Sequence, residues 1–312
     1  RATEETRPRV VALLYVMFLV GMGISALLIG WLLRDFTPIR LVRVVQGAAV
    51  AGLLLNLIAL WKQERVIHMT KAQRAAPRPL FSEAWSDFMS GGKAGRLLVT
   101  VFIGTMAFNM QDVLLEPYGG EVLGLSVSST TLLTALWAAG ALVGFAYAAK
   151  RLASKTSSYR LAAVGLLAGL AAFSAVIFSA PFNSAVMFFI GASLIGFGGG
   201  LFAVATLTTA MALPVEGNAG RGLALGAWGA AQATAAGLSI AIGGTIRDAV
   251  NTQALAGTFG EALAVPSTGY SVVYHTEIAL IFITLIALGP LVRRTHDETS
   301  ETKGIGLADF PT

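Results

Sequence analysis

Eight long apolar runs dominate the chain, and polar segments separate them. Each run holds about 20 residues, the length that an α-helix needs to cross a hydrocarbon core of ~30 Å. The runs are continuous rather than alternating, which predicts membrane-spanning helices and not the strands of a barrel. The predicted spans are residues 10–33, 41–61, 97–115, 132–149, 161–180, 185–213, 223–246 and 272–292.

The third run is the unusual one, because four polar side chains appear before the span is complete. On a continuous helix, Thr105, Asn109, Asp112 and Glu116 fall at i, i+4, i+7 and i+11, which places them in one stripe. At 1.5 Å per residue from residue 97, Asn109 lies roughly 18 Å deep, Asp112 roughly 22 Å and Glu116 roughly 28 Å. Gln111 falls off the stripe but stays a candidate because of its depth.

Ionisable groups at membrane depth are costly, so they mark a pathway, a partner or a paired site. Two interpretations of the stripe are open. The carboxylates either reach the far surface and cap neighbouring helices, or they form a polar patch that faces the bundle interior or a partner. Pro117 and the pair Gly119 and Gly120 predict that the helix ends directly after Glu116.

Composition supports an all-α integral membrane protein. The 312 residues are 55% hydrophobic and 12% charged, against roughly 25% charged in soluble domains. The net charge of +5 does not indicate nucleic acid, because the 22 Lys and Arg residues are distributed by membrane side. All but four of them lie on the side of the N-terminus, so the positive-inside rule predicts that both ends of the chain are cytoplasmic. The four exceptions are Arg34, Arg40, Arg43 and Arg247.

The sequence shows no chemistry typical of an enzyme or a metal site. It has no cysteine, and no P-loop, HExxH or Ser/His/Asp arrangement is recognisable. We therefore predict a protein that is not an enzyme and holds no metal ion. Polar residues inside the other spans are few: Gln46, Asn56, Gln232, His275 and Glu277. His275 is expected to be a hydrogen-bonded interface residue, with a metal ligand as the alternative.

A polar segment at residues 62–96 divides two spans from six. Within it, Phe81, Trp85, Phe88 and Met89 share one helical face, which predicts a short helix on the cytoplasmic membrane surface. A plain inter-bundle loop is the alternative. The predicted parts are two helices of a first bundle at 1–61, a linker at 62–96, a six-helix bundle at 97–295 and a cytoplasmic tail at 296–312.

The first and seventh spans resemble each other, from Arg9-Val-Val-Ala-Leu to Arg34-Asp35 and from Arg221-Gly-Leu-Ala-Leu to Arg247-Asp248. Internal duplication is typical of secondary transporters. If the two spans are equivalent, they are the fifth and eleventh helices of a twelve-helix protein, and residues that precede Arg1 are missing. Chance similarity between helices rich in Ala, Gly and Leu is the alternative.

Small residues predict close helix packing in two spans. Gly140 and Gly144 form one GxxxG motif, and a second lies within Gly196-Phe-Gly-Gly-Gly. A hinge at Gly198, Gly199 and Gly200 is the alternative to a packing role.

Five stretches resemble one known family. The string FNMQDVLLEPYGGEVLGLSVSSTTLLTALWAAGALVGF, which contains the polar stripe, is the most specific. The other stretches are ETRPRVVALLYVMFLVGM, IGFGGGLFAVATLTTAM, GRGLALGAWGAAQATAAGLSIAIGG and VVYHTEIALIFITLIALGPLVRR. Together they resemble the PucC/LhaA-type family, the bacteriochlorophyll-delivery branch of the major facilitator superfamily.

The resemblance implies helices 5–12 of a twelve-helix fold in a bacterial intracytoplasmic photosynthetic membrane. It implies an assembly factor for light-harvesting complexes that contacts antenna polypeptides or the reaction-centre–antenna complex and handles bacteriochlorophyll transiently. Candidate contacts to the pigment or partner are Asn109, Gln111, Asp112, Glu116 and His275. The alternatives are a proton-coupled transporter, with Asp112 or Glu116 as proton carrier, and a structural subunit of a photosynthetic complex.

Overall fold

Helices make up nearly all of the computed structural model, which describes residues 7–32, 37–61, 80–90, 92–154, 156–213 and 221–301. This part of the chain contains no β-strand, so the all-α prediction is confirmed. Most of the predicted linker and tail, at residues 62–79 and 302–312, lies outside the described residues. The helices are α1 (Arg7–Leu32), α2 (Pro38–Leu60), α4 (Phe81–Ser90), α5 (Lys93–Asn109), α6 (Leu115–Glu121), α7 (Val127–Ala153), α8 (Ser158–Ser179), α9 (Ala185–Ala212), α10 (Arg221–Leu255), the 3₁₀ turn η1 (Glu261–Leu263) and α11 (Ser267–Glu301).

Every predicted span corresponds to helix, but the third is not one helix. Among the described residues, six helices are long and apolar enough to cross a membrane, in α2 and α7 to α11. The first predicted span falls on α1. The third is divided between the 17 residues of α5 and the seven of α6, with a non-helical turn between them. The prediction of an unbroken helix over 97–115 is therefore wrong.

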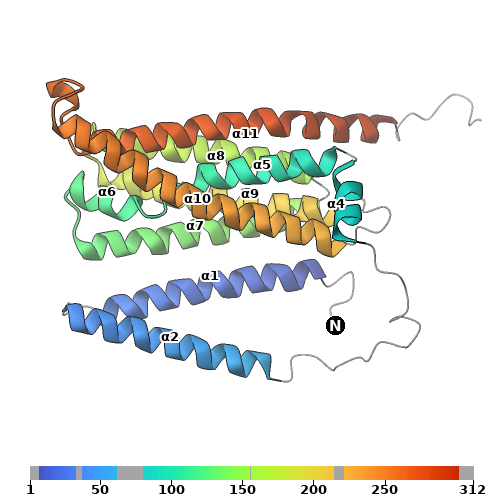
Figure 1. Cartoon of the computed structure of the whole chain (residues 1–312), viewed down its shortest axis with the longest axis horizontal. Helices are drawn as coiled ribbons and strands as arrows, with labels where there is room; N and C mark the ends of the chain where they lie inside the picture. The colour runs from blue at the N-terminus through green and yellow to red at the C-terminus, as the bar shows by residue number, and fades with distance from the viewer. Residues whose placement is uncertain are drawn as a thin grey trace, which may run out of the picture.

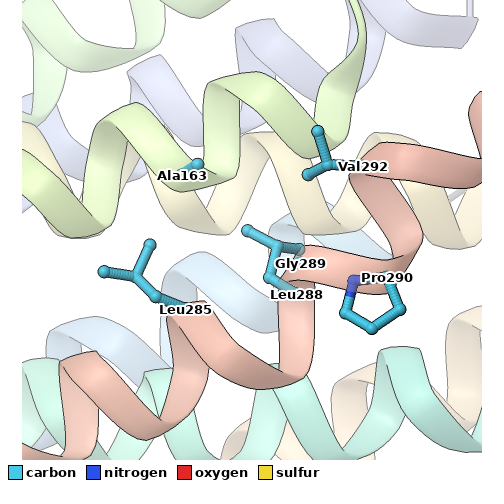
Figure 2. A pocket seen from close by; sticks show the side chains of 6 residues that line it. All are labelled: Ala163, Leu285, Leu288, Gly289, Pro290 and Val292. Atoms are coloured by element: carbon cyan, nitrogen blue, oxygen red, sulfur yellow. The ribbon is translucent and has the colours of Figure 1, made fainter. Parts of the chain in front are cut away.

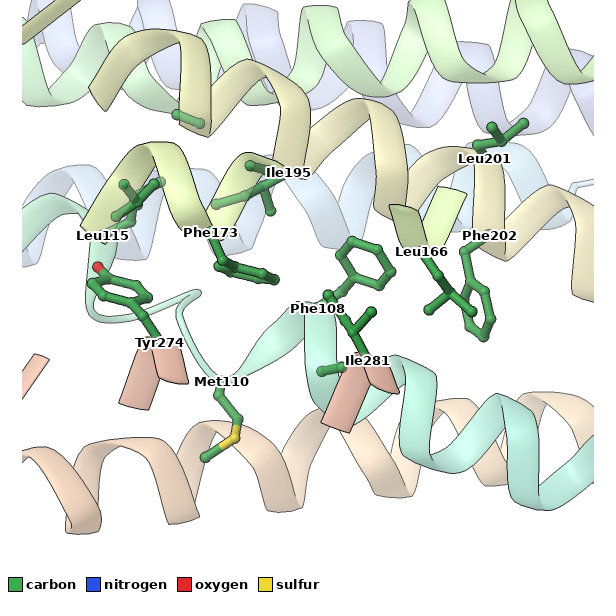
Figure 3. Packing of buried hydrophobic residues seen from close by; sticks show 14 of the residues in the cluster. Phe108, Met110, Leu115, Leu166, Phe173, Ile195, Leu201, Phe202, Tyr274 and Ile281 are labelled. Atoms are coloured by element: carbon green, nitrogen blue, oxygen red, sulfur yellow. The ribbon is translucent and has the colours of Figure 1, made fainter. Parts of the chain in front are cut away.

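Six long helices form one bundle, in which α9 packs against α7 and α8 and α5 packs against α10 and α11 (Figure 1). Contact between α11 and α8 joins the two groups. Phe108 of α5 lies at the centre of the core, with its ring 6.3 Å from that of Phe173 and 6.0 Å from that of Phe202 (Figure 3). The last turn of α5 is thus anchored where three helices meet.

The helices α1 and α2 lie beside this bundle (Figure 1). Contacts between α1 and α7 attach the pair. No residue of α2 is buried, although most of its residues are apolar. An apolar surface of this kind needs lipid or further protein about it, so we expect α2 to face one of these in the membrane.

The short helix predicted within the linker is present as α4. Its residues Ala84 and Phe88 are buried against Ala94 of α5 and against Ala224 and Ala227 of α10. On the same helix, Phe81 and Trp85 stack with ring centroids 5.9 Å apart, and Phe81 is exposed. Its placement on the membrane surface stays a prediction.

The last two long helices extend past the ends of their apolar runs. The seventh run ends at residue 246, yet α10 continues to Leu255; the eighth ends at 292, yet α11 continues to Glu301. Hydropathy marks the part of a helix that lipid can hold, whereas the backbone hydrogen bonds carry on into polar sequence. The turns beyond the seventh run position the side chains of a polar cluster described below.

Candidate functional site

The polar segment of the third span is a break between two helices. α5 ends at Asn109, residues 110–114 form a turn, and α6 begins at Leu115. Within the turn, the carbonyl of Gln111 accepts from the N–H groups of both Leu114 (2.8 Å) and Leu115 (3.0 Å). Pro117, Gly119 and Gly120, which were predicted to end the helix, instead lie inside α6.

The break disperses the predicted stripe. Asn109 is half-buried, and its Nδ2 donates to the carbonyl of Thr105 one turn back, at 2.7 Å. Asp112 lies in the turn and is exposed. Glu116 is exposed on α6 and accepts a hydrogen bond from Thr134 of α7 at 2.9 Å. The stripe on a continuous helix is therefore wrong, and with it the depths counted for Asp112 and Glu116, which lie beyond the end of α5.

Gln111, which fell off the stripe, is the residue at the centre of the break. It is 1% exposed. Its side-chain Nε2 donates to Asp112 Oδ1 at 2.9 Å and to the carbonyl of Phe108 at 3.2 Å, while its backbone N–H donates to Glu277 Oε1 at 2.8 Å. The residue thus bridges two carboxylates, one in the turn and one on α11.

Glu277 was a polar residue of the last span in the sequence but not a candidate for the site. It is fully buried, and its second carboxylate oxygen, Oε2, has no hydrogen-bond partner among the described residues. The hydroxyl of Tyr274, one turn before it, is likewise buried and unpaired in this part of the chain. The sequence feature that could have identified Glu277 as a site residue is that it is the one carboxylate within the predicted span at residues 272–292.

Aromatic rings surround this end of the core. The ring of Tyr118 meets those of Tyr270 and Tyr274 edge-on, each with centroids 5.4 Å apart, and Phe173 stacks on Tyr274 at 6.4 Å. The Tyr118 hydroxyl donates to the carbonyl of Val176 at 3.2 Å. Glu277 therefore lies beside an apolar and aromatic environment, in which charge is poorly stabilised.

His275 lies near Glu277 in sequence but on another side of α11. Its side chain is exposed, and its Nδ1 is 2.7 Å from the carbonyl of Ser271. Because a carbonyl oxygen only accepts, Nδ1 carries the proton, which leaves the lone pair of a neutral imidazole on Nε2. The structure therefore places His275 and Glu277 in separate surroundings.

A second polar cluster joins the last residue of α6, the later part of α10 and the first turn of α11. An Arg247 guanidinium nitrogen donates to Glu121 Oε2 at 2.5 Å and to the Tyr270 hydroxyl at 2.8 Å, and that hydroxyl donates to Glu121 at 2.8 Å. The guanidinium also lies over the Tyr270 ring, 4.6 Å from its centroid. These three residues are far apart in sequence, so spacing could not have predicted the cluster.

The glycine motifs lie where helices approach most closely. A Cβ atom on Gly140 would collide with the carbonyl of Ser193, and one on Gly196 would collide with the carbonyl of Trp137. α9 runs unbroken through Gly198, Gly199 and Gly200. The remaining contacts are Gly144 against Phe197, Gly198 against Gly165, Gly199 against Phe108 and Gly200 against Ala141.

An apolar pocket of about 430 Å³ opens between α8 and α11 (Figure 2). Its lining residues are Ala163, Leu285, Leu288, Gly289, Pro290 and Val292. It offers no polar side chain to a ligand and contains none of the candidate residues. Among the described residues, no group of three or more His, Cys, Asp or Glu side chains could hold a metal ion.

The fold and the buried polar break define an all-α, multi-pass membrane protein. Comparison with known sequences is more specific: the family described as PUCC protein matches residues 1–296. The chain therefore belongs to the PUCC protein family.

Three relatives show how far the similarity extends. The "Uncharacterized protein in puhA-bchM intergenic region" of Rhodobacter capsulatus is 60% identical over 100% of this chain and 66% of its own length. "Protein PucC" of Rhodovulum sulfidophilum is 48% identical over 81% of this chain and 56% of its own length. The "Bacteriochlorophyll synthase 44.5 kDa chain" of Rhodobacter capsulatus is 29% identical over 94% of this chain and 67% of its own length.

The chain thus spans about two-thirds or less of the length of these relatives. No solved structure is significantly similar to it.

Proposed function

We propose that the protein to which this chain belongs is an assembly factor for bacterial light-harvesting antenna complexes, working in the photosynthetic membrane with both ends of this chain cytoplasmic. In this proposal it contacts antenna polypeptides and holds bacteriochlorophyll transiently. Membership of the PUCC family supports the link to photosynthetic membranes. The single structural observation that supports bacteriochlorophyll binding is the orientation of the His275 imidazole.

His275 has the donor chemistry that a bacteriochlorophyll magnesium ion accepts. Imidazole nitrogen is a common ligand for metals in proteins. The hydrogen bond from Nδ1 to Ser271 fixes the ring and leaves Nε2 as the available donor. His275 Nε2 would hold the magnesium ion of the pigment, and the pigment would supply the light-absorbing ring.

The surface that continues from His275 along α11 is apolar. Ala279, Phe282, Ile283 and Ile286 follow it at i+4, i+7, i+8 and i+11, which places all five on one helical face, and all are exposed. Of the three large apolar side chains in this set, Ile286 is the most exposed, at 76%. A flat hydrophobic ring system beside His275 would cover part of this surface.

In this proposal the polar break contributes less to pigment contact than His275 does. Gln111 is buried and Asn109 bonds to its own helix, so neither offers a free donor to a large ligand. Asp112 and Glu116 are exposed and stay candidates for contact with an antenna helix.

The test uses the full-length protein in a phototrophic host that lacks its own copy. Strains carry wild type, His275→Ala, or the control Thr276→Val. The hydroxyl of Thr276 donates to the carbonyl of Val272 on its own helix. Membrane absorption spectra report the antenna, and pigment extracted from the purified protein reports bacteriochlorophyll per polypeptide. We expect His275→Ala to lose most of the bound pigment and to lower the antenna content, while Thr276→Val matches wild type.

Equal pigment content in His275→Ala and wild type would contradict the role of His275. Normal antenna content in a strain without the gene would contradict the assembly role itself. The double variant Asp112→Asn with Glu116→Gln tests antenna contact separately, because it removes both exposed carboxylates without altering His275.

We also propose that the protein is not an enzyme, although one relative is named a bacteriochlorophyll synthase chain. Pigment analysis of the deletion strain distinguishes the two cases. An assembly factor leaves bacteriochlorophyll synthesis chemically complete but reduces the pigment held in antenna complexes. Accumulation of a biosynthetic precursor in place of bacteriochlorophyll would indicate an enzyme.

A further inference from the structure

Glu277 is a carboxyl group with half of its hydrogen-bonding capacity unused. It is 0% exposed. Its Oε1 accepts one hydrogen bond, from the neutral backbone N–H of Gln111, and its Oε2 has no hydrogen-bond partner among the described residues. An ionised carboxylate removed from water needs a counter-charge or several donors to be stable. One backbone N–H is a weak substitute for either.

No cation in the described structure compensates this group. On α10, Arg247 is engaged by Glu121, Asp248 and Tyr270. The cations of α5 and α8 lie in the first turns of those helices, in Lys93, Arg96 and Arg160, far along each helix from the break.

Two titratable side chains interact electrostatically with Glu277, and neither of them carries a positive charge. Asp112, across the break, is close enough to interact with it electrostatically, and its charge has the same sign. Tyr274, on the same helix, also interacts with it and is itself fully buried. Like charges in one site disfavour the doubly ionised state.

We propose that Glu277 and Asp112 form a proton-binding site in which Glu277 carries a proton in the structure described, with Gln111 as the bridge between the two carboxyl groups. Gln111 reaches Glu277 through its backbone N–H and Asp112 through its side-chain amide. Asp112 is exposed at the surface of the protein, so in this proposal it passes the proton to and from Glu277. A proton fits better than a metal ion, because cations such as Ca²⁺ take six or more oxygen ligands and no sufficient cluster exists among the described residues.

The site is placed to couple protonation to the conformation of α5 and α6. The backbone N–H of Gln111, which donates the hydrogen bond to Glu277, belongs to the turn that separates the two helices. Loss of the proton leaves a charge in an apolar position beside Asp112, which favours rearrangement of the turn. The inference goes beyond antenna assembly, since it requires neither pigment nor a partner.

The test is infrared spectroscopy of the full-length protein in lipid nanodiscs without pigment. A protonated, poorly hydrogen-bonded carboxyl group gives a C=O stretch well resolved from the amide bands. We expect this band in wild type at neutral pH and its loss on alkaline titration. Glu277→Gln removes the band, whereas Asp112→Asn keeps it but shifts its loss to lower pH, because the neighbouring negative charge is gone.

Glu116→Gln is the matched control, because Glu116 is an exposed carboxyl group bonded to Thr134 and away from Glu277. Its spectrum should equal that of wild type. A wild-type protein without the band at neutral pH, or a band that persists in Glu277→Gln, overturns the proposal. Since the readout needs no antenna, its failure and failure of the assembly proposal are distinguishable.

Discussion

The backbone N–H of Gln111 donates to the side chain of Glu277 at 2.8 Å across 166 positions of sequence. In an unbroken helix that N–H would bond to the carbonyl four residues earlier. Here a carboxyl oxygen of α11 replaces that acceptor, so the end of α5 depends on a side chain from another helix. The break is therefore a tertiary feature and not a local one.

Substitution of Glu277 should show how much stability this bond provides. Glu277→Leu leaves the buried N–H of Gln111 without an acceptor, which costs about 1–3 kcal/mol. Glu277→Gln retains an acceptor oxygen and should stay close to wild type. Thermal unfolding of the purified protein in detergent checks both variants. Equal stability of the Leu and Gln variants would show that the bond contributes little.

α10 passes close to the break, which makes two neighbouring glycines an informative pair. A Cβ atom on Gly243 would lie 2.7 Å from the carbonyl oxygen of Met110, whereas one on Gly244 would have nothing within 4 Å. Gly243→Ala should therefore destabilise the protein by about 1–3 kcal/mol. Gly244→Ala should be neutral or stabilise by up to about 1 kcal/mol, the helix propensity gained. Thermal unfolding of the two variants side by side checks the difference, and equal stability would contradict the close approach.

The apolar runs predicted the helices well, because a membrane span is a local property of sequence. Each run of about 20 residues specifies its own backbone hydrogen bonds. The break after Asn109 was not predicted, because it depends on a contact between residues far apart in the sequence. Neither Pro nor Gly occupies residues 108–116, and the acceptor for Gln111 lies on α11. Pro117 and Gly119 were read as the end of the helix, yet α6 accommodates them in its first turns.

Sequence reasoning chose the polar residues of the candidate site by their position inside an apolar run, and their role in function stays a prediction. Which of them meet could not be read from a helical stripe, because the stripe assumed one continuous helix. Gln111 and Glu277 meet, while Asn109 and Glu116 bond elsewhere.

The contact between α7 and α9 should be sensitive to any added side chain. Gly140 lies against the carbonyl of Ser193, and Gly196 lies against that of Trp137. Gly140→Ala and Gly196→Ala should each lower the free energy of unfolding by about 1–3 kcal/mol, because the two helices must separate. Gly237→Ala, with nothing within 4 Å of its added Cβ, is the control. Detergent unfolding curves that coincide for all three would contradict the packing role.

Glu121 and Arg247 join the ends of α6 and α10, and a double-mutant cycle can measure their coupling. The Glu121 side chain is 48% exposed and that of Arg247 is 21% exposed, so solvent screens the pair. We expect a coupling free energy of roughly 0.2–1 kcal/mol between Glu121→Gln and Arg247→Gln. Repeating the cycle in Tyr270→Phe, which keeps the ring under the guanidinium but removes the shared hydroxyl, isolates the contribution of the hydrogen bonds. A smaller coupling in that background is expected, because the Tyr270 hydroxyl bonds to both partners and holds them in one geometry; an unchanged coupling would assign the interaction to the ion pair alone.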